Sequence, residues 1–67
     1  MSEVAVFKAI HDLALKIIHP LPSGGFEVRK NFYLTPALAY WDAVELIVGL
    51  SSTEYGFNIK KAEDELI

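Results

Sequence analysis

The most informative segment of the chain is TPALAYWDAVELIVGL, which runs from Thr35 to Leu50. Thr35 is a favourable N-cap residue, and Pro36 suits the first helical position because its missing N–H would find no partner there. Of the 15 residues from Pro36 to Leu50, 11 are apolar. The sequence therefore predicts a helix over 36–50 that is apolar over roughly 220° of its circumference, which is more than one neighbouring helix covers. Such a helix is either central or part of an interface.

An amphipathic helix is also predicted upstream, over residues 2–18. Ser2 is the expected N-cap, and the helix is expected to end before Pro20, because the residue preceding a proline avoids the helical conformation. Val4 and Leu15 widen the apolar arc on one edge, so this helix is expected to contact neighbours on more than one side. The arc itself consists of Val6, Phe7, Ile10, Leu13, Ala14, Ile17 and Ile18.

Between the two helices, residues 20–25 are rich in proline and glycine and are expected to reverse the chain. Residues 25–34 then predict either one short strand or a tight hairpin, because apolar and polar residues alternate there. The hairpin version turns at residues 29–31, with Asn31 in a left-handed conformation. The alternation predicts one face with Phe26, Val28, Phe32 and Leu34 and an opposite face with Glu27, Arg29, Asn31 and Tyr33.

After Leu50 the helical pattern stops. Residues 51–54 have the spacing of a capping box, and Gly56 is expected to end that segment. Asn58 is the expected cap of a short helix over 59–66, in which lysines precede acidic residues. This charge order opposes the helix macrodipole, so the sequence predicts a weak C-terminal helix. The fold class expected for residues 1–67 is a single small α+β domain that is mainly helical.

The composition of the chain argues against several classes of protein. Six lysines and arginines against nine acidic residues leave a net charge of −3, without the basic surface of a nucleic-acid reader. The longest uncharged stretch, residues 31–41, is shorter than the about 18 apolar residues of a membrane-spanning helix. The first residues lack the basic region and cleavage site of a secretory signal, and cysteine is absent, so a cytoplasmic protein is expected.

The length of the chain bears on its association. A chain of 67 residues barely buries enough apolar surface to offset the entropy lost on ordering. Without cysteine, it has neither a disulfide nor a cysteine-based zinc site for support. Because 52% of its residues are hydrophobic, self-association into a homo-oligomer such as a homodimer is expected.

Few residues suggest catalysis. The hydroxyl cluster at residues 51–53 lies at a helix junction and is expected to cap the helix rather than to react. Asp42 and Glu45 lie three residues apart, the spacing at which two carboxylates share a cation or a proton, but no histidine on the same helix completes a metal site. A solvated face is expected there. The sequence thus predicts no enzyme, no cofactor and no metal.

Five residues are predicted to bind a partner. Tyr40 and Trp41 fall on different parts of the apolar arc of residues 36–50, with Trp41 near Val48, and aromatic anchors of this kind dominate many protein interfaces. Packing in the core is the alternative for the two rings. Phe7 and His11 belong to the arc of the first helix; His11 lies between Ile18 and Val4 in angular position, where a neutral imidazole needs a partner for its N–H. A histidine whose ring N–H has a hydrogen-bond partner, at an interface or the core edge, is expected there, with a pH-sensitive switch or a ligand as the alternative.

Residues 31–67 also resemble part of a known family. The segments DAVELI, from Asp42, and YGFNI, from Tyr55, followed by KKAEDELI, resemble the recognition helix of acyl carrier proteins and the segment after it. In that family a serine just before this helix carries 4′-phosphopantetheine, but residues 39–41 are Ala, Tyr and Trp. The resemblance implies a degenerate acyl-carrier-like domain without the attachment hydroxyl.

Together these features predict a non-enzymatic protein-interaction module, such as a small adaptor or inhibitor, that associates with itself through its apolar helix faces. A degenerate acyl-carrier-like or apolar-ligand-binding domain is the alternative function. The sequence does not identify the protein partner.

Overall fold

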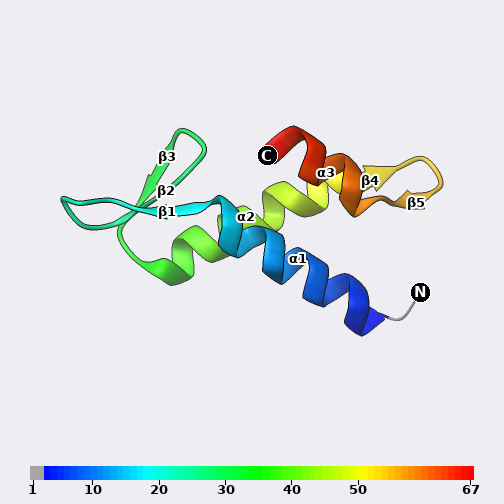
Figure 1. The fold of residues 1–67 in the computed structure, drawn as a ribbon, viewed down its shortest axis with the longest axis horizontal. Helices are drawn as coiled ribbons and strands as arrows, with labels where there is room; N and C mark the ends of the chain where they lie inside the picture. The colour runs from blue at the N-terminus through cyan, green and yellow to red at the C-terminus, as the bar shows by residue number, and fades with distance from the viewer. Residues whose placement is uncertain (1–2) are drawn as a thin grey trace.

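The computed structural model describes residues 3–67, which form a small, mainly helical α+β fold (Figure 1). The expected N-cap, Ser2, lies outside these residues. The elements in chain order are α1 (Glu3–Ile17), β1 (Ile18–Pro20), β2 (Phe26–Val28), β3 (Asn31–Tyr33), α2 (Pro36–Ser51), β4 (Ser52–Thr53), β5 (Gly56–Phe57) and α3 (Ile59–Leu66). The predicted helices are therefore confirmed, with boundaries within one residue of those expected inside the described part of the chain.

The three helices form the body of the molecule. Helices α1 and α2 lie side by side, and α3 packs against both, more extensively against α2 (Figure 1). The sheet of β1, β2 and β3 lies at one end of this body, and the β4–β5 hairpin lies at the other. The molecule measures 41 × 21 × 15 Å, so it is elongated and thin. Several large apolar side chains of α1 and α2 have no layer that covers them.

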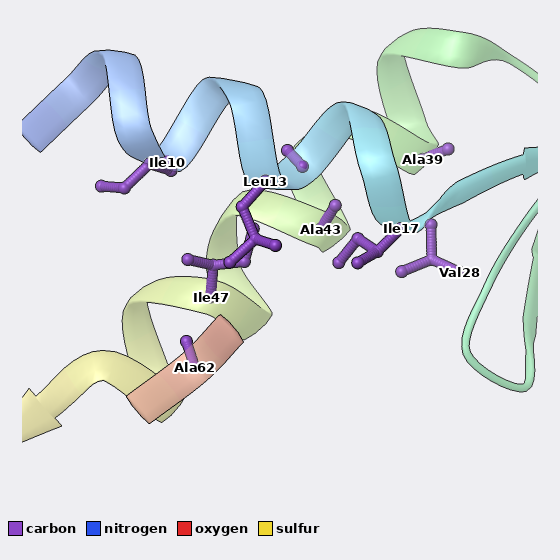
Figure 2. Packing of buried hydrophobic residues seen from close by; sticks show 9 residues of the cluster. Ile10, Leu13, Ile17, Val28, Ala39, Ala43, Ile47 and Ala62 are labelled. Atoms are coloured by element: carbon purple, nitrogen blue, oxygen red, sulfur yellow. The ribbon is translucent and has the colours of Figure 1, made fainter. Parts of the chain in front are cut away.

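The core is built largely from small side chains. Four alanines, one or more from each helix, are fully buried, and they let the helix backbones approach closely. Ile47 is the largest fully buried side chain. Figure 2 shows Leu13 of α1 close to Ile47 of α2, and Ala62 of α3 below them. The buried hydrophobic residues are Ile10, Leu13, Ala14, Ile17, Val28, Ala39, Ala43, Ile47 and Ala62.

The segment after α1 forms a strand that the sequence did not predict. Helix α1 ends at Ile17, and the next residues, Ile18–Pro20, pair antiparallel with β2, with His19 opposite Glu27. A proline is tolerated there because β1 is an edge strand of the sheet. The rule that ends a helix before Pro20 was correct, but it did not distinguish a turn from a strand, since both use the extended conformation.

The predicted hairpin is present, but its faces differ from the prediction. Val28 pairs with Asn31, so the turn consists of residues 29 and 30, and Arg29 rather than Asn31 adopts the left-handed conformation, with φ 55°. A two-residue turn reverses the alternation, because paired residues lie on the same face. Tyr33 therefore shares a face with Phe26 and is partly buried. The predictions that Phe32 and Leu34 share the face of Val28 were wrong: these two side chains are exposed.

The C-terminal part combines a correct and an incorrect prediction. The expected cap and stop at residues 51–56 is instead the β4–β5 hairpin, in which Ser52 pairs with Phe57. Helix α3 begins at Ile59 as predicted, but the side chain of Asn58 makes no capping hydrogen bond. The backbone N–H of Asn58 instead donates a hydrogen bond to the carbonyl oxygen of Ser51, at 2.7 Å. Packing of Ala62 against the core holds this helix, although its charge order still opposes the macrodipole.

A glycine pair before β2 offers a test of the turn. Gly24 and Gly25 both have positive φ, +98° and +81°, and a Cβ at Gly25 would lie 2.8 Å from the backbone oxygen of Tyr33. We expect Gly25→Ala to lower the free energy of unfolding by about 2 kcal/mol or more. Gly24→Ala is the matched control, because no atom lies within 4 Å of its Cβ position, and only the backbone strain applies. If urea denaturation showed the same loss in the free energy of unfolding for both variants, the close contact at Gly25 would be contradicted.

Candidate functional site

Exposed apolar side chains are abundant on this molecule. Among the described residues, those of α1 and α2 are the most suggestive, because several of them continue one stripe along each helix. We define the α1–α2 face as the surface made by Val4, Phe7, His11 and Leu15 of α1 with Tyr40, Trp41 and Val48 of α2. The large hydrophobic residues that are exposed are Val4, Phe7, Leu15, Phe32, Leu34, Leu38, Trp41, Val48, Tyr55, Phe57 and Ile67.

Aromatic contacts join the two helices within the α1–α2 face. The Nδ1 atom of His11 and the hydroxyl oxygen of Tyr40 are hydrogen-bonded at 2.9 Å, and their rings are 5.6 Å apart between centroids. Tyr40 in turn meets the Trp41 ring edge-on, with centroids 5.6 Å apart and an interplanar angle of 78°. Edge-to-face packing is a favourable arrangement for aromatic rings. The stripes of the two helices are therefore connected by a continuous row of three rings.

The structure brings three of the five predicted partner-binding residues, His11, Tyr40 and Trp41, into ring contact, and the other two, Phe7 and Val48, lie on the same two helices. Phe7 and Trp41 are 68% and 66% exposed, and His11 is also exposed. Val48 is 39% exposed, and Tyr40 is half-buried against the core. The expectation that His11 needs a partner is confirmed by its hydrogen bond with Tyr40. Core packing, the alternative for the two aromatic rings, applies in part to Tyr40 and not to Trp41.

Sequence reasoning left two members of the face out of the predicted set. Val4 and Leu15 were recognised as the edge of the apolar arc but not as partner-binding residues, and they are 76% and 56% exposed. Their spacing from Phe7 and His11 indicates that they share a face with these residues, since residues three or four apart on a helix lie on the same side. The buried side of α1 uses different positions, among them Ile10, Leu13 and Ile17.

The overall dimensions agree with an incompletely covered fold. The radius of gyration is 12.4 Å, whereas a compact chain of this length has about 10.9 Å. The accessible surface is 4873 Å², compared with about 4,250 Å² for a typical monomer of 7.5 kDa. The molecule therefore exposes more surface than its mass requires, and large apolar side chains contribute to the excess.

The ion pair Lys8–Asp12 borders the α1–α2 face. The lysine Nζ donates to the Asp12 carboxylate at 2.8 Å, and both side chains are exposed. This hydrogen bond lowers the pKa of Asp12 and raises the pKa of Lys8. The rim of the face at this point thus carries one positive and one negative charge that compensate each other.

The acidic pair of α2 lies on another side of the molecule. Asp42 and Glu45 line a cavity of about 340 Å³ together with Arg29 and Asn31 of the β2–β3 hairpin. Interaction with the Asp42 side chain raises the pKa of Tyr33. Within residues 3–67, no group of three or more histidine or acidic side chains is arranged to hold a metal ion. Of the pair, Asp42 is half-buried beside the hairpin, whereas Glu45 is exposed, as a solvated face predicts.

The hydroxyl cluster at the end of α2 has structural partners. Ser52 donates its hydroxyl to the Val48 carbonyl at 2.9 Å. The Ser51 hydroxyl is fully buried and has no hydrogen-bond partner among the described residues. A nucleophilic serine needs a base within hydrogen-bond reach, which neither position shows here.

A second apolar feature lies between α1, β5 and α3. A cavity of about 360 Å³ is lined chiefly by apolar side chains, including Val6, Phe57 and Ile59. It is separate from the α1–α2 face, because it uses Val6 and Ala9 of α1 rather than Phe7 and His11. Its size suits a small apolar ligand or a single side chain of another protein.

The bond between His11 and Tyr40 leads to a testable prediction. Tyr40→Phe removes the hydroxyl but keeps the ring. We expect the free energy of unfolding to fall by less than about 1 kcal/mol, because the hydrogen bond is exposed to water. The proton resonances of the His11 ring are expected to shift in nuclear magnetic resonance spectra. The control is Tyr55→Phe, because Tyr55 lies outside the α1–α2 face. Unchanged His11 resonances in the Tyr40 variant would contradict the bond.

No helix among the described residues has the length and apolar character needed to span a membrane. Comparisons with protein-family models, curated proteins and solved structures found no match to this chain.

Proposed function

We propose that this protein is a non-enzymatic interaction module, of the kind used as a small adaptor or inhibitor, and that it associates with itself through the α1–α2 face. The observation that carries the proposal is the exposure of Phe7 on α1 and of Trp41 on α2, together with the ring contacts by which His11, Tyr40 and Trp41 connect the two helices. Exposed aromatic rings on a rigid helical surface are frequent anchors of protein interfaces.

The size of the face is suitable for an interface. From the exposed fractions of its members, the α1–α2 face offers on the order of 600 Å² of apolar surface. A stable protein interface buries about 800 Å² on each partner, with a polar rim around an apolar centre. The Lys8–Asp12 pair supplies such a rim beside Phe7 and His11.

The proposal is tested by sedimentation equilibrium over a range of protein concentrations. We expect the mass to rise from monomer to dimer, and Trp41→Ala to weaken this association by about tenfold or more, as for a hot-spot residue. Leu34→Ala is the control, because Leu34 is 77% exposed but lies outside the α1–α2 face. A stable monomer at every concentration, together with no binding of a hydrophobic dye, would remove the basis of the proposal.

A second candidate function is the binding of an apolar ligand by a degenerate acyl-carrier-like domain. The cavity next to Val6, Phe57 and Ile59 supports it. Because residues 39–41 contain no serine, this function relies on non-covalent binding. Native mass spectrometry of the purified protein separates the two candidates: a bound lipid supports the second, and a ligand-free dimer supports the first.

A further inference from the structure

His11 lies between exposed apolar side chains of α1. Phe7 and Leu15 are four residues before and after it, and residues four apart on a helix share a face. The Nδ1 atom of His11 is hydrogen-bonded to the hydroxyl oxygen of Tyr40 at 2.9 Å, which holds the ring beside α2. A partner that covers Phe7, Leu15 and Tyr40 therefore also covers His11.

In the single molecule His11 is exposed, so water solvates both of its charge states. Histidine is the side chain whose charge changes between about pH 5 and pH 8. The hydrogen bond with Tyr40 survives protonation, because a charged imidazole donates from both ring nitrogens and the hydroxyl oxygen accepts. Protonation of His11 is therefore expected to leave the fold unchanged.

The charged and titratable groups near His11 supply no free counter-ion. On α1 the neighbouring carboxylate, Asp12, is already bound to Lys8 at 2.8 Å. This hydrogen bond is the main reason why the pKa of Asp12 is lowered, and the charge of His11 contributes much less. On α2 the titratable group that meets the ring is the hydroxyl of Tyr40. On α3, Lys60 borders the separate cavity beside β5.

The α1–α2 face itself contains no acidic residue. When the partner is a second copy of this chain, the opposing surface carries the same residues. A charged His11 would then lose its water without gaining a carboxylate across the interface, which is strongly unfavourable.

We infer that protonation of His11 controls self-association through the α1–α2 face: copies associate while the imidazole is neutral and separate when it is charged. This inference rests on the proposed function, and it adds regulation by pH.

The sign of the effect distinguishes it from the influence of net charge. The dimer binds fewer protons at His11 than two separate copies do, so a fall in pH favours the separate copies. The net charge predicts the opposite. It is −3 at pH 7 and the isoelectric point is about 5.1, so repulsion between copies decreases as the pH falls. Weaker association on acidification therefore indicates a group that becomes charged within the interface.

Sedimentation equilibrium at about pH 8 and about pH 5.5, at one ionic strength, tests the inference. We expect the unmodified protein to associate at least about tenfold more weakly at the lower pH, because each copy contributes one histidine. His11→Gln is expected to abolish this weakening, since glutamine carries no charge and is a good helix former. The control is His19→Gln, because His19 is the other histidine of the chain and is exposed on β1. This variant is expected to keep the full weakening.

Nuclear magnetic resonance gives a second measurement that needs no variant. The titration midpoint of the His11 ring is expected to move to lower pH as the protein concentration rises, whereas that of His19 stays constant. A constant His11 midpoint, or association that does not weaken at the lower pH, overturns the inference while the self-association stands. If the unmodified protein is monomeric at both pH values, the proposed function itself fails. The two failures are therefore distinguishable.

Discussion

Replacing Ile47 with alanine is expected to unfold most of the protein at room temperature. Ile47 is the largest fully buried side chain, and it lies where α1, α2 and α3 meet (Figure 2). Removing such a side chain costs about 2–5 kcal/mol through lost burial and the cavity left behind. A core of this size supplies only about 3–5 kcal/mol of net stability, so little or none remains in the variant. Circular dichroism during urea titration measures the loss.

The matched control for this variant lies on the same helix. Leu38→Ala removes a comparable amount of apolar side chain from an exposed position in the first turn of α2. We expect its midpoint of urea denaturation to change little, because surface substitutions stay mostly within about 0.5 kcal/mol. If the two variants lost equal stability, the packing centred on Ile47 would not be what holds the helices together.

The second large effect is expected on association. Replacing Phe7 and Leu15 together with glutamate is expected to weaken self-association by about 100-fold or more, because four charges in the dimer lose their water without a partner. Glutamate is a good helix former, and both positions are exposed, so α1 is expected to keep its structure. Sedimentation equilibrium measures the association, and circular dichroism measures the helix content of the same samples.

Leu34→Glu serves as the control for this double variant, because it places a carboxylate at an exposed apolar residue outside the α1–α2 face. Its association is expected to equal that of the unmodified protein. Undiminished association of the Phe7 and Leu15 variant would show that another surface mediates self-association. Loss of helix content in that variant would instead show that α1 needs its exposed apolar side chains in order to fold.

The helices were predictable because their signals are local. Thr35 accepts a hydrogen bond from the Leu38 N–H at 3.2 Å, which is the capping interaction that its position before Pro36 predicts. Helix α3 begins at Ile59 as expected, even though the side chain of Asn58 makes no cap. Periodicity and helix-end residues act within a few positions of each other, so they are readable without knowledge of the tertiary structure.

The strands were less predictable, because pairing decides them. The three residues of β1 have no strand pattern of their own and become a strand because β2 lies beside them. The same applies to β4: Ser52 caps the end of α2 as expected, but its pairing with Phe57 was not predicted. The faces of Phe32 and Tyr33 were reversed by the length of the turn at residues 29 and 30, a difference of register that alternation alone does not reveal.

The candidate site shows the same division. The amphipathic pattern was sufficient to select Phe7, His11 and Trp41 as exposed or interfacial residues. It did not show that His11 and Tyr40 join through a hydrogen bond, since these residues are 29 positions apart in the chain. It also did not separate Leu15, which is exposed, from Ala14, which is buried in the core.

The amino-acid pattern alone indicates helices with more apolar surface than a chain of 67 residues can bury. Periodicity and capping are properties of neighbouring residues, so they are present in the sequence. Which part of that surface is buried depends on how the helices pack together. The four buried alanines bring the helices close together and fill the core with few large side chains. The large side chains of the α1–α2 face remain outside, because a thin arrangement of three helices and a small sheet has no further layer to cover them.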